Sequence, residues 1–256
     1  MKMLIQAACG CHIGKVRKNN EDNFFFDGKC LEEKNSGLKH PVIIEETLRN
    51  GFHTAIFDGM GGENFGELAS YAAARQMQSM QRNLADFLIP ERKYLDRMTK
   101  QLHQAVIDQQ RKMQTEKMGT TMVTLYFSGR YVYVCNVGDS RAYRLRDGEF
   151  LQLSHDHIEK RPGREGRKAP LTQHLGFGAG ELELEPHIAK GEIKAGDIYL
   201  LCSDGLSDML TNFEISDIML TTPDPESCVQ ALIRAACEHG GRDNITAIVC
   251  RLDRGE

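Results

Sequence analysis

The 256-residue sequence has no apolar run that approaches a membrane span and little excess of charge of either sign. A spanning helix needs about 20 predominantly apolar residues. With 32 basic and 36 acidic side chains the net charge is −4, which favours neither nucleic acid nor a membrane surface as a partner. Residues 1–10 also lack the ordered charged region, apolar core and cleavage site of a secretory signal. We therefore expect a cytoplasmic protein.

Internal repeats, low-complexity tracts and domain linkers are also absent from the sequence. A content of 41% hydrophobic and 27% charged residues is ordinary for a globular protein with a sizeable core. We expect a single domain over residues 1–256.

The eight cysteines do not suit a disulfide framework, which is typical of small secreted domains, and they lie mostly inside apolar patterns. The segment Cys9-Gly10-Cys11-His12 could begin a soft-metal site, but no second Cys/His pair at zinc spacing follows it. The sequence therefore predicts reduced core cysteines.

Residues 52–62 are the stretch around which the chain is organised. An alternating apolar run over 52–57 predicts a strand that delivers Asp58 into a glycine-rich loop. Gly59, Gly61 and Gly62 would let the backbone approach a ligand. Asp-Gly is also the commonest hairpin turn, so this stretch alone leaves a plain turn open.

A second acidic segment precedes the strand expected at 24–26. Glu21 and Asp22 are adjacent and would repel each other unless a cation or a basic group lay between them. Arg17 lies in the same connection. Taken alone, this segment could equally be a solvated charged turn.

Two amphipathic helices should follow the central strand. Asn64 as N-cap with Glu67 three residues later predicts the start of the first, and the second should cover 92–116. From Gly119 the period changes to two, which predicts an antiparallel meander of strands at 121–127, 131–137, 141–145 and 150–153. Asp139 lies at one of its turns, and His155-Asp156-His157 is typical of a capped turn rather than a metal site.

The C-terminal part repeats the pattern of a buried strand that ends in an acid. A strand over 197–203 leads into Asp204, and a helix starting near Gly205 would place Asp208 on the same side as Asp204. The last helix should have Asp224 at its N-cap and stop at Gly240-Gly241, before Asp243 and a final strand at 245–252.

Acids thus recur at strand ends. Carboxylates that share a cleft need cations, and oxygen ligands without His or Cys favour Mg²⁺ or Mn²⁺. Two such ions roughly 3.5–4 Å apart can activate a water and clamp an anionic substrate for in-line displacement at phosphorus. Arg17 would add a bidentate grip on the phosphoryl oxygens.

Eight short motifs in one order carry a resemblance to a known family. The chain resembles the metal-dependent serine/threonine protein phosphatases of the protein phosphatase 2C type, and their bacterial-like single-domain members, over essentially its whole length. The motifs are Gly14-x-x-Arg17-x-x-Asn20-Glu21-Asp22, Asp58-Gly59-Met60-Gly61-Gly62, Gly119-Thr120-Thr121, Gly138-Asp139-Ser140-Arg141, Leu153-Ser154-x-Asp156-His157, Leu171-Thr172-x-x-Leu175-Gly176, Ser203-Asp204-Gly205 and Arg242-Asp243-Asn244.

The resemblance implies an α+β fold, a four-layer α-β-β-α sandwich of two central antiparallel sheets flanked by helices. It implies hydrolysis of phosphoserine and phosphothreonine on proteins by a metal-bridging water or hydroxide, with Arg17 binding phosphate. Two Mn²⁺ or Mg²⁺ ions per subunit are implied, with a third, weaker site. The implied metal-binding residues are Asp58 as the bridge, the Gly59 carbonyl with Glu21 and Asp22 for one ion, Asp204 and Asp243 for the other, and Asp139 and Asp208 with Asp204 for the third.

Two departures from the family bear on substrate choice. Relatives with a histidine after the Asp-Gly pair use it as general acid, whereas this chain has Met60. The flap beside the site is reduced to about Ile158–Pro170. A phosphatase of small phosphorylated metabolites therefore stays open, as does a catalytically weak regulatory relative, although no metal acid is lost. We expect a monomer that opposes a serine/threonine kinase in signalling.

Overall fold

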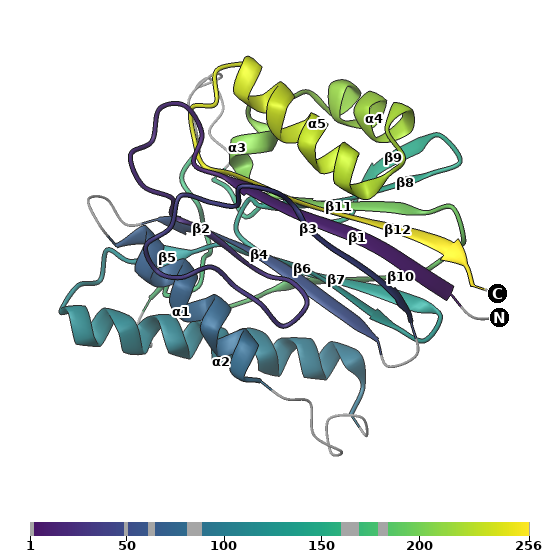
Figure 1. The fold of residues 1–256 in the computed structure, drawn as a ribbon. Helices are drawn as coiled ribbons and strands as arrows, with labels where there is room; N and C mark the ends of the chain where they lie inside the picture. Colours follow the sequence, from purple (N-terminus) through teal and green to yellow (C-terminus); the bar gives the residue numbers. More distant parts are fainter. Residues whose placement is uncertain are drawn as a thin grey trace.

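Two antiparallel sheets lie face to face between two layers of helices in a computed structural model of the protein (Figure 1). The structure describes residues 3–48, 51–60, 65–80, 89–159, 169–178 and 184–255. One sheet has the strand order β3 (Val42–Thr47), β1 (Met3–His12), β12 (Ile245–Arg254), β11 (Ile198–Cys202), β8 (Arg141–Arg146) and β9 (Glu149–Gln152). The other has the order β10 (His187–Glu192), β7 (Tyr131–Val137), β6 (Met122–Ser128), β4 (Phe52–Met60) and β2 (Asp22–Phe25), with β5 (Gly119–Thr120) paired to β4.

Each sheet is covered on its outer face by its own helices. α1 (Gly66–Ser79) and α2 (Glu91–Met113) pack on the sheet that contains β4, where Met77 and Leu102 belong to the same buried cluster as Phe57 and Tyr126. α4 (Asn212–Thr221) and α5 (Pro225–Glu238) cover the sheet that contains β1, and the short α3 (Asp204–Ser207) follows β11. The predicted four-layer α-β-β-α sandwich is confirmed.

The central core lies between the sheets and follows the period-two pattern of the strands. Along β1, Ile5, Ala7 and Cys9 belong to the core between the sheets, whereas Ala8 packs toward α5. Phe127 of β6 and Tyr199 of β11 meet edge to face across the sheets at a centroid distance of 5.4 Å. Because both faces of the central strands are buried, their sequences are nearly continuously apolar.

The predicted four-stranded meander is wrong. β6 and β7 form a hairpin in one sheet and β8 and β9 form a hairpin in the other. The chain crosses between the sheets at residues 138–140, where Gly138 has a φ of 102° and a Cβ would lie 2.7 Å from the Thr121 side chain. A buried strand shows the same pattern in either sheet, so periodicity could not place the crossing.

The observed helices differ from the predicted ones in three places. α1 begins at Gly66 with Phe65 at its cap, and the predicted cap Asn64 lies outside the described residues. α2 ends at Met113, before a left-handed Gln114. α4 was not predicted, although its capping box of Thr211 and Glu214 is visible in the sequence. The expected α5, from the Asp224 cap to the Gly240 stop, is confirmed.

The cysteines and the helices agree with a globular interior. All eight cysteines are free thiols, and six of them are buried. Within the described ranges, no helix has both the length and the apolar character needed to cross a membrane.

A buried ion pair fixes the start of β11, the strand that leads to Asp204. Asp197 is fully buried and accepts from Arg146 Nε and Nη2 at 2.6 Å and from the Tyr199 hydroxyl at 2.9 Å. The backbone N–H of Lys194 adds a bond of 2.7 Å. Four donors therefore satisfy one buried carboxylate.

We expect Asp197→Ala to lower the free energy of unfolding by about 3 kcal/mol, because removal of one partner leaves the Arg146 charge uncompensated. Urea denaturation would measure the loss. Asp217→Ala, at an exposed position of α4, is the control and should change stability by less than about 0.5 kcal/mol. A loss at Asp197 no larger than that of the control would contradict this assignment.

Candidate metal and phosphate site

The predicted site residues gather at the end of the sheets opposite the two chain termini (Figure 1). β2 and β4 are neighbours there, and their register pairs Asp22 directly with Asp58. The Asp58 carbonyl accepts from Thr121 N at 2.8 Å and from Thr120 Oγ1 at 2.9 Å. These bonds fix the end of β4 and hold the half-buried Asp58 at the sheet edge.

Gly59 lies where three segments converge. Its N–H donates to the Glu21 carbonyl at 3.1 Å. A Cβ at this position would lie 2.1 Å from the Gly66 carbonyl oxygen and 2.5 Å from that of Glu21, so only glycine fits. The approach of Gly59 to a ligand stays a prediction, and Gly61 and Gly62 lie outside the described residues.

Asp22 is a buried carboxylate held by two hydroxyl groups. It is 2% exposed, and its Oδ2 accepts from Ser203 Oγ at 2.7 Å and from Thr246 Oγ1 at 2.6 Å. Burial raises the pKa of Asp22 to about 7, although the two hydrogen bonds favour the ionised form. The charges of Asp243 and Glu21 raise this pKa further.

Arg17 forms an ion pair with Asp243, 226 positions later in the chain. Its Nη2 lies 2.7 Å from Asp243 Oδ2, and the side chains are 46% and 29% exposed. Burial disfavours the charged guanidinium, but the hydrogen bond and charge of Asp243, followed by the charges of Glu21 and Asp58, raise its pKa overall. A cationic fork therefore lies among three acidic side chains, those of Asp243, Glu21 and Asp58.

Glu21 is the half-buried acid of this group. Burial raises the pKa of Glu21; the charge of Arg17 opposes this rise and that of Glu67 adds to it. Glu67, which the sequence pattern assigned to a helix cap, is 8% exposed. The predicted cap Asn64 lies outside the described residues, so its capping box with Glu67 stays a prediction. Glu67 lies close enough to Glu21 for its charge to act on that acid.

Asn244 ties the Arg17 segment to β12. Its Nδ2 donates to the carbonyls of Ile13 at 2.9 Å and Asn19 at 3.0 Å, and its Oδ1 accepts from Glu21 N at 2.8 Å. Both ends of the connection that carries Arg17 are thereby fixed to the residue next to Asp243. The side chain is 2% exposed and its polar atoms have partners.

A cavity of about 530 Å³ contains the remaining predicted acids. Asp139, Asp204, Asp208 and Asp243 line it, with Asp204 only 4% exposed. On the same lining, Arg141 makes a bidentate pair with Asp156, whose Oδ2 lies 2.7 Å from Arg141 Nη2. The assignment of 155–157 to a capped turn agrees with this pair and with the bond from Gly138 N to His157 Nδ1 at 3.2 Å.

The acids therefore form two neighbouring groups. Glu21, Asp22 and Asp58 lie at the β2–β4 edge, and the cavity holds the other four. The bond from Ser203 to Asp22 and the pair of Arg17 with Asp243 join the groups. Within the described ranges, no three carboxylate, imidazole or thiol groups already surround one point.

This arrangement still fits hard divalent ions. The donors available are carboxylate and carbonyl oxygens, which Mg²⁺ and Mn²⁺ prefer, and Mg²⁺ sites usually combine one or two carboxylates with several waters. The clustered negative charge that raises the pKa of Asp22 is also the environment that a cation stabilises.

The sequence analysis missed three residues that hydrogen-bond to the candidate site residues or to their segments. Asn244 and Ser203 stand inside recognised motifs but had no role, and Thr246 lies outside any motif. The signal for Thr246 was a hydroxyl group in the otherwise apolar strand at 245–250. Polar residues in such a run need buried partners, although the sequence does not say which.

Comparison with known proteins identifies the family and the fold. The family model of protein phosphatase 2C matches residues 46–235. The serine/threonine phosphatase stp of Listeria welshimeri is 30% identical over 254 residues, which cover 92% of this chain and 91% of that protein. PstP of Mycobacterium tuberculosis is also 30% identical, over 96% of this chain, but the match spans only 45% of PstP.

The solved catalytic domain of PstP, in complex with two manganese ions, has a similar structure. It superposes with a TM-score of 0.72 at 29% identity, over 98% of this chain and 100% of that domain. Family model, relative and fold coincide over most of the chain, and the chain belongs to the protein phosphatase 2C family of serine/threonine protein phosphatases.

Proposed function

We propose that this protein hydrolyses phosphoserine and phosphothreonine on other proteins, using two divalent cations held between the sheets. The observation that carries the proposal is the pairing of Arg17 with Asp243 beside a cavity lined with carboxylates. A guanidinium among acids can receive a phosphoryl group, whose charge bound cations would help to offset. The names of the Listeria and Mycobacterium relatives support this substrate class.

The residues that would hold the cations follow from the two groups of acids. Asp58 would serve both ions, Glu21, Asp22 and the Gly59 carbonyl one of them, and Asp204 and Asp243 the other. Asp139 and Asp208, with Asp204, would form a third, weaker site. When bound, the cations lower the pKa of a water and offset the charge of the phosphoryl oxygens. The two manganese ions of the PstP domain support Mn²⁺, and Mg²⁺ has the same ligand preference.

The side chains around the acids would position the substrate. Arg17 would turn its two terminal nitrogens toward the phosphoryl oxygens, in exchange for its pair with Asp243. Asn244 would hold the Arg17 segment in place for this exchange. Ser203 and Thr246 would keep Asp22 oriented whether or not it is ionised, because each can donate to the same oxygen.

Phosphorylated proteins are the partners that this function implies, in opposition to a serine/threonine kinase. We propose a cytoplasmic, monomeric signalling enzyme with one catalytic domain over residues 1–256. The match to stp over nine tenths of both chains supports the single domain. Comparing turnover on phosphopeptides with that on small phosphorylated metabolites tests the substrate class, and a preference for the metabolites would contradict it.

Activity should require added Mn²⁺ or Mg²⁺ and vanish with a chelator, because oxygen ligands release such ions readily. Asp204→Asn should lower kcat by on the order of 100-fold or more, since it removes charge that holds a cation. In contrast, Asp139→Ala should still bind the two tight ions, because Asp139 is assigned to the third, weaker site. Calorimetry would measure this binding. Full activity after exhaustive chelation would overturn the metal assignment.

Asn244→Ala should lower kcat on p-nitrophenyl phosphate by about tenfold or more, because displaced positioning groups are costly to catalysis. It should also cost about 2 kcal/mol of stability, from three lost hydrogen bonds. Assays at a temperature where urea curves show the variant folded separate the two effects. Lower stability with unchanged kcat would show that Asn244 is structural only.

Because residue 60 is a methionine, we expect kcat to depend steeply on the pKa of the leaving group. A thioether donates no proton, so an alkyl phosphate departs with less help than an aryl phosphate, and a general acid contributes on the order of 10²–10⁴-fold. Met60→His should raise kcat on alkyl phosphates more than on aryl ones, and should add a limb to the pH profile near about 6.5. If the dependence of kcat on leaving-group pKa has the same slope in the wild type and in Met60→His, another group already supplies the proton.

A further inference from the structure

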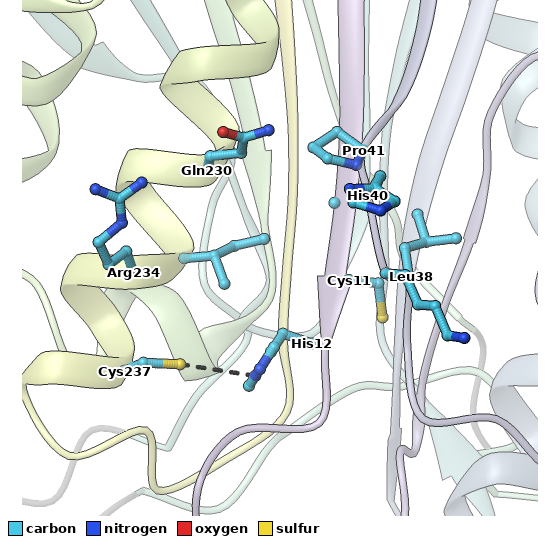
Figure 2. A pocket seen from close by; sticks show the side chains of 11 residues that line it. Cys11, His12, Leu38, His40, Pro41, Gln230, Arg234 and Cys237 are labelled. Atoms are coloured by element: carbon cyan, nitrogen blue, oxygen red, sulfur yellow. Dashed lines mark hydrogen bonds between the residues drawn. The ribbon is translucent and has the colours of Figure 1, made fainter.

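A second cavity, of about 510 Å³, lies between α5 and the end of β1 (Figure 2). Gln230, Arg234 and Cys237 succeed one another along α5 on one side of it. On the other side are His12 at the end of β1 and the segment 38–41 that precedes β3. The acids of the candidate metal and phosphate site do not line this cavity.

The charged side chains that line this cavity are of one sign. Lys39 and Arg234 are cationic, His12 and His40 contribute imidazoles, and no aspartate or glutamate is among the described residues that line it. Within the described part of the chain, the side chains of Lys39, His40 and Arg234 also make no ion pair or hydrogen bond. In a protein with a net charge of −4, a concave surface with unpaired cations favours an anionic ligand.

The other lining groups suit an organic ligand rather than a bare ion. Leu38, Pro41 and Ile233 offer apolar contact. The Gln230 amide oxygen can accept a hydrogen bond, while its Nε2 donates to Glu226 Oε1 at 3.3 Å. Ligand sites typically have volumes of roughly 300–1,000 Å³ and combine apolar walls with a few polar groups. We propose that this cavity binds an organic phosphate of about nucleotide size as an effector. A dianionic phosphate matches a lysine and an arginine better than a single carboxylate does.

The walls of this cavity continue into the segments that carry Arg17 and Asp243. His12 Nδ1 accepts from Gly14 N at 2.9 Å and lies 3.6 Å from Cys237 Sγ. Just beyond, Lys15 N donates to the Gly241 carbonyl at 2.7 Å.

Gly14 is packed against the Asp243 carbonyl, where a Cβ would lie only 2.2 Å from the oxygen. A ligand that displaces His12 or the end of α5 therefore moves a contact adjoining Arg17 or Asp243. The binding is independent of the proposed activity, whereas its effect on turnover rests on that activity.

Calorimetry on the Mn²⁺-loaded enzyme tests the binding. The probe is the phosphonate analogue of adenosine monophosphate, whose carbon–phosphorus bond resists hydrolysis. Arg234→Ala and Lys39→Ala should each weaken its binding by about tenfold or more, through loss of a charge-assisted contact. The controls Arg92→Ala and Lys93→Ala, at exposed positions of α2, should leave it unchanged.

Two comparison ligands define the ligand class. Adenosine should bind far more weakly than the phosphonate, because it lacks the anion. If citrate binds and the phosphonate does not, and if citrate binding depends on Arg234 and Lys39 in the same way, the assignment to phosphates is wrong. Absence of phosphonate binding at millimolar concentration, or binding that is indifferent to both variants, would overturn the site.

Thiol alkylation followed by mass spectrometry locates the ligand. Cys237 lines the cavity, whereas Cys30 is also partly buried but does not line it and is the internal control. The bound phosphonate should slow labelling of Cys237 several-fold and leave Cys30 unchanged. Equal protection of both thiols, or of neither, would contradict binding here.

Turnover of p-nitrophenyl phosphate tests the coupling separately. The phosphonate should change kcat or KM in the wild type, and the change should be lost in Arg234→Ala. If binding and thiol protection are found but turnover is unaffected in an active enzyme, the effector role is wrong. An enzyme without any phosphatase activity would instead refute the proposed function and leave the binding result standing.

Discussion

Mutual repulsion among carboxylates is the constraint on which the end of the sandwich depends. Asp22 and Asp58 are register partners on adjacent strands, and Asp243 and Asp204 approach from the other sheet. Charges of like sign at such positions repel one another and oppose folding, and the charges of Asp243 and Glu21 add to the rise in the pKa of Asp22. The protein offsets part of this repulsion with the guanidinium of Arg17 and part by supplying hydroxyl donors to Asp22.

The junction of the two sheets is consequently polar where the rest of the interior is apolar. Ser203 and Thr246 come from the ends of β11 and β12, yet they bind a carboxylate of β2 in the opposite sheet. Asn244 makes a similar junction between β12 and the connection after β1. Buried networks of this kind are rigid only when every member is satisfied, so the loss of one bond affects several segments.

α5 connects the two cavities through its C-terminal end. Its residues Gln230, Ile233, Arg234 and Cys237 line the cavity beside β1. Two glycines with positive φ then turn the chain toward Asp243. The same Gly241 accepts from Lys15, so the ends of β1 and α5 are held as one unit. A ligand bound in the cavity beside β1 could therefore change the candidate metal and phosphate site, because both adjoin the ends of β1 and α5.

The sequence by itself determined the elements and the chemistry. Period-two and period-3.6 patterns predicted most strands and helices, because burial imposes these repeats locally. Acids beside glycines at strand ends predicted an oxygen-donor site with Arg17, and the structure brings Arg17 to Asp243 and groups the remaining acids around this pair.

Only the tertiary structure decided how these pieces meet. Period-two patterning looks alike in both sheets, so the crossing at 138–140 was invisible in the sequence. The burial of Asp22 under Ser203 and Thr246 could not be predicted either, because its partners are more than 180 positions away. Likewise, Glu67 matched a helix cap, whereas its place beside Glu21 depends on how α1 packs against the β2–β4 edge. Local patterns record what is buried, whereas hydrogen bonds and charges between distant segments exist only once the sheets have packed together.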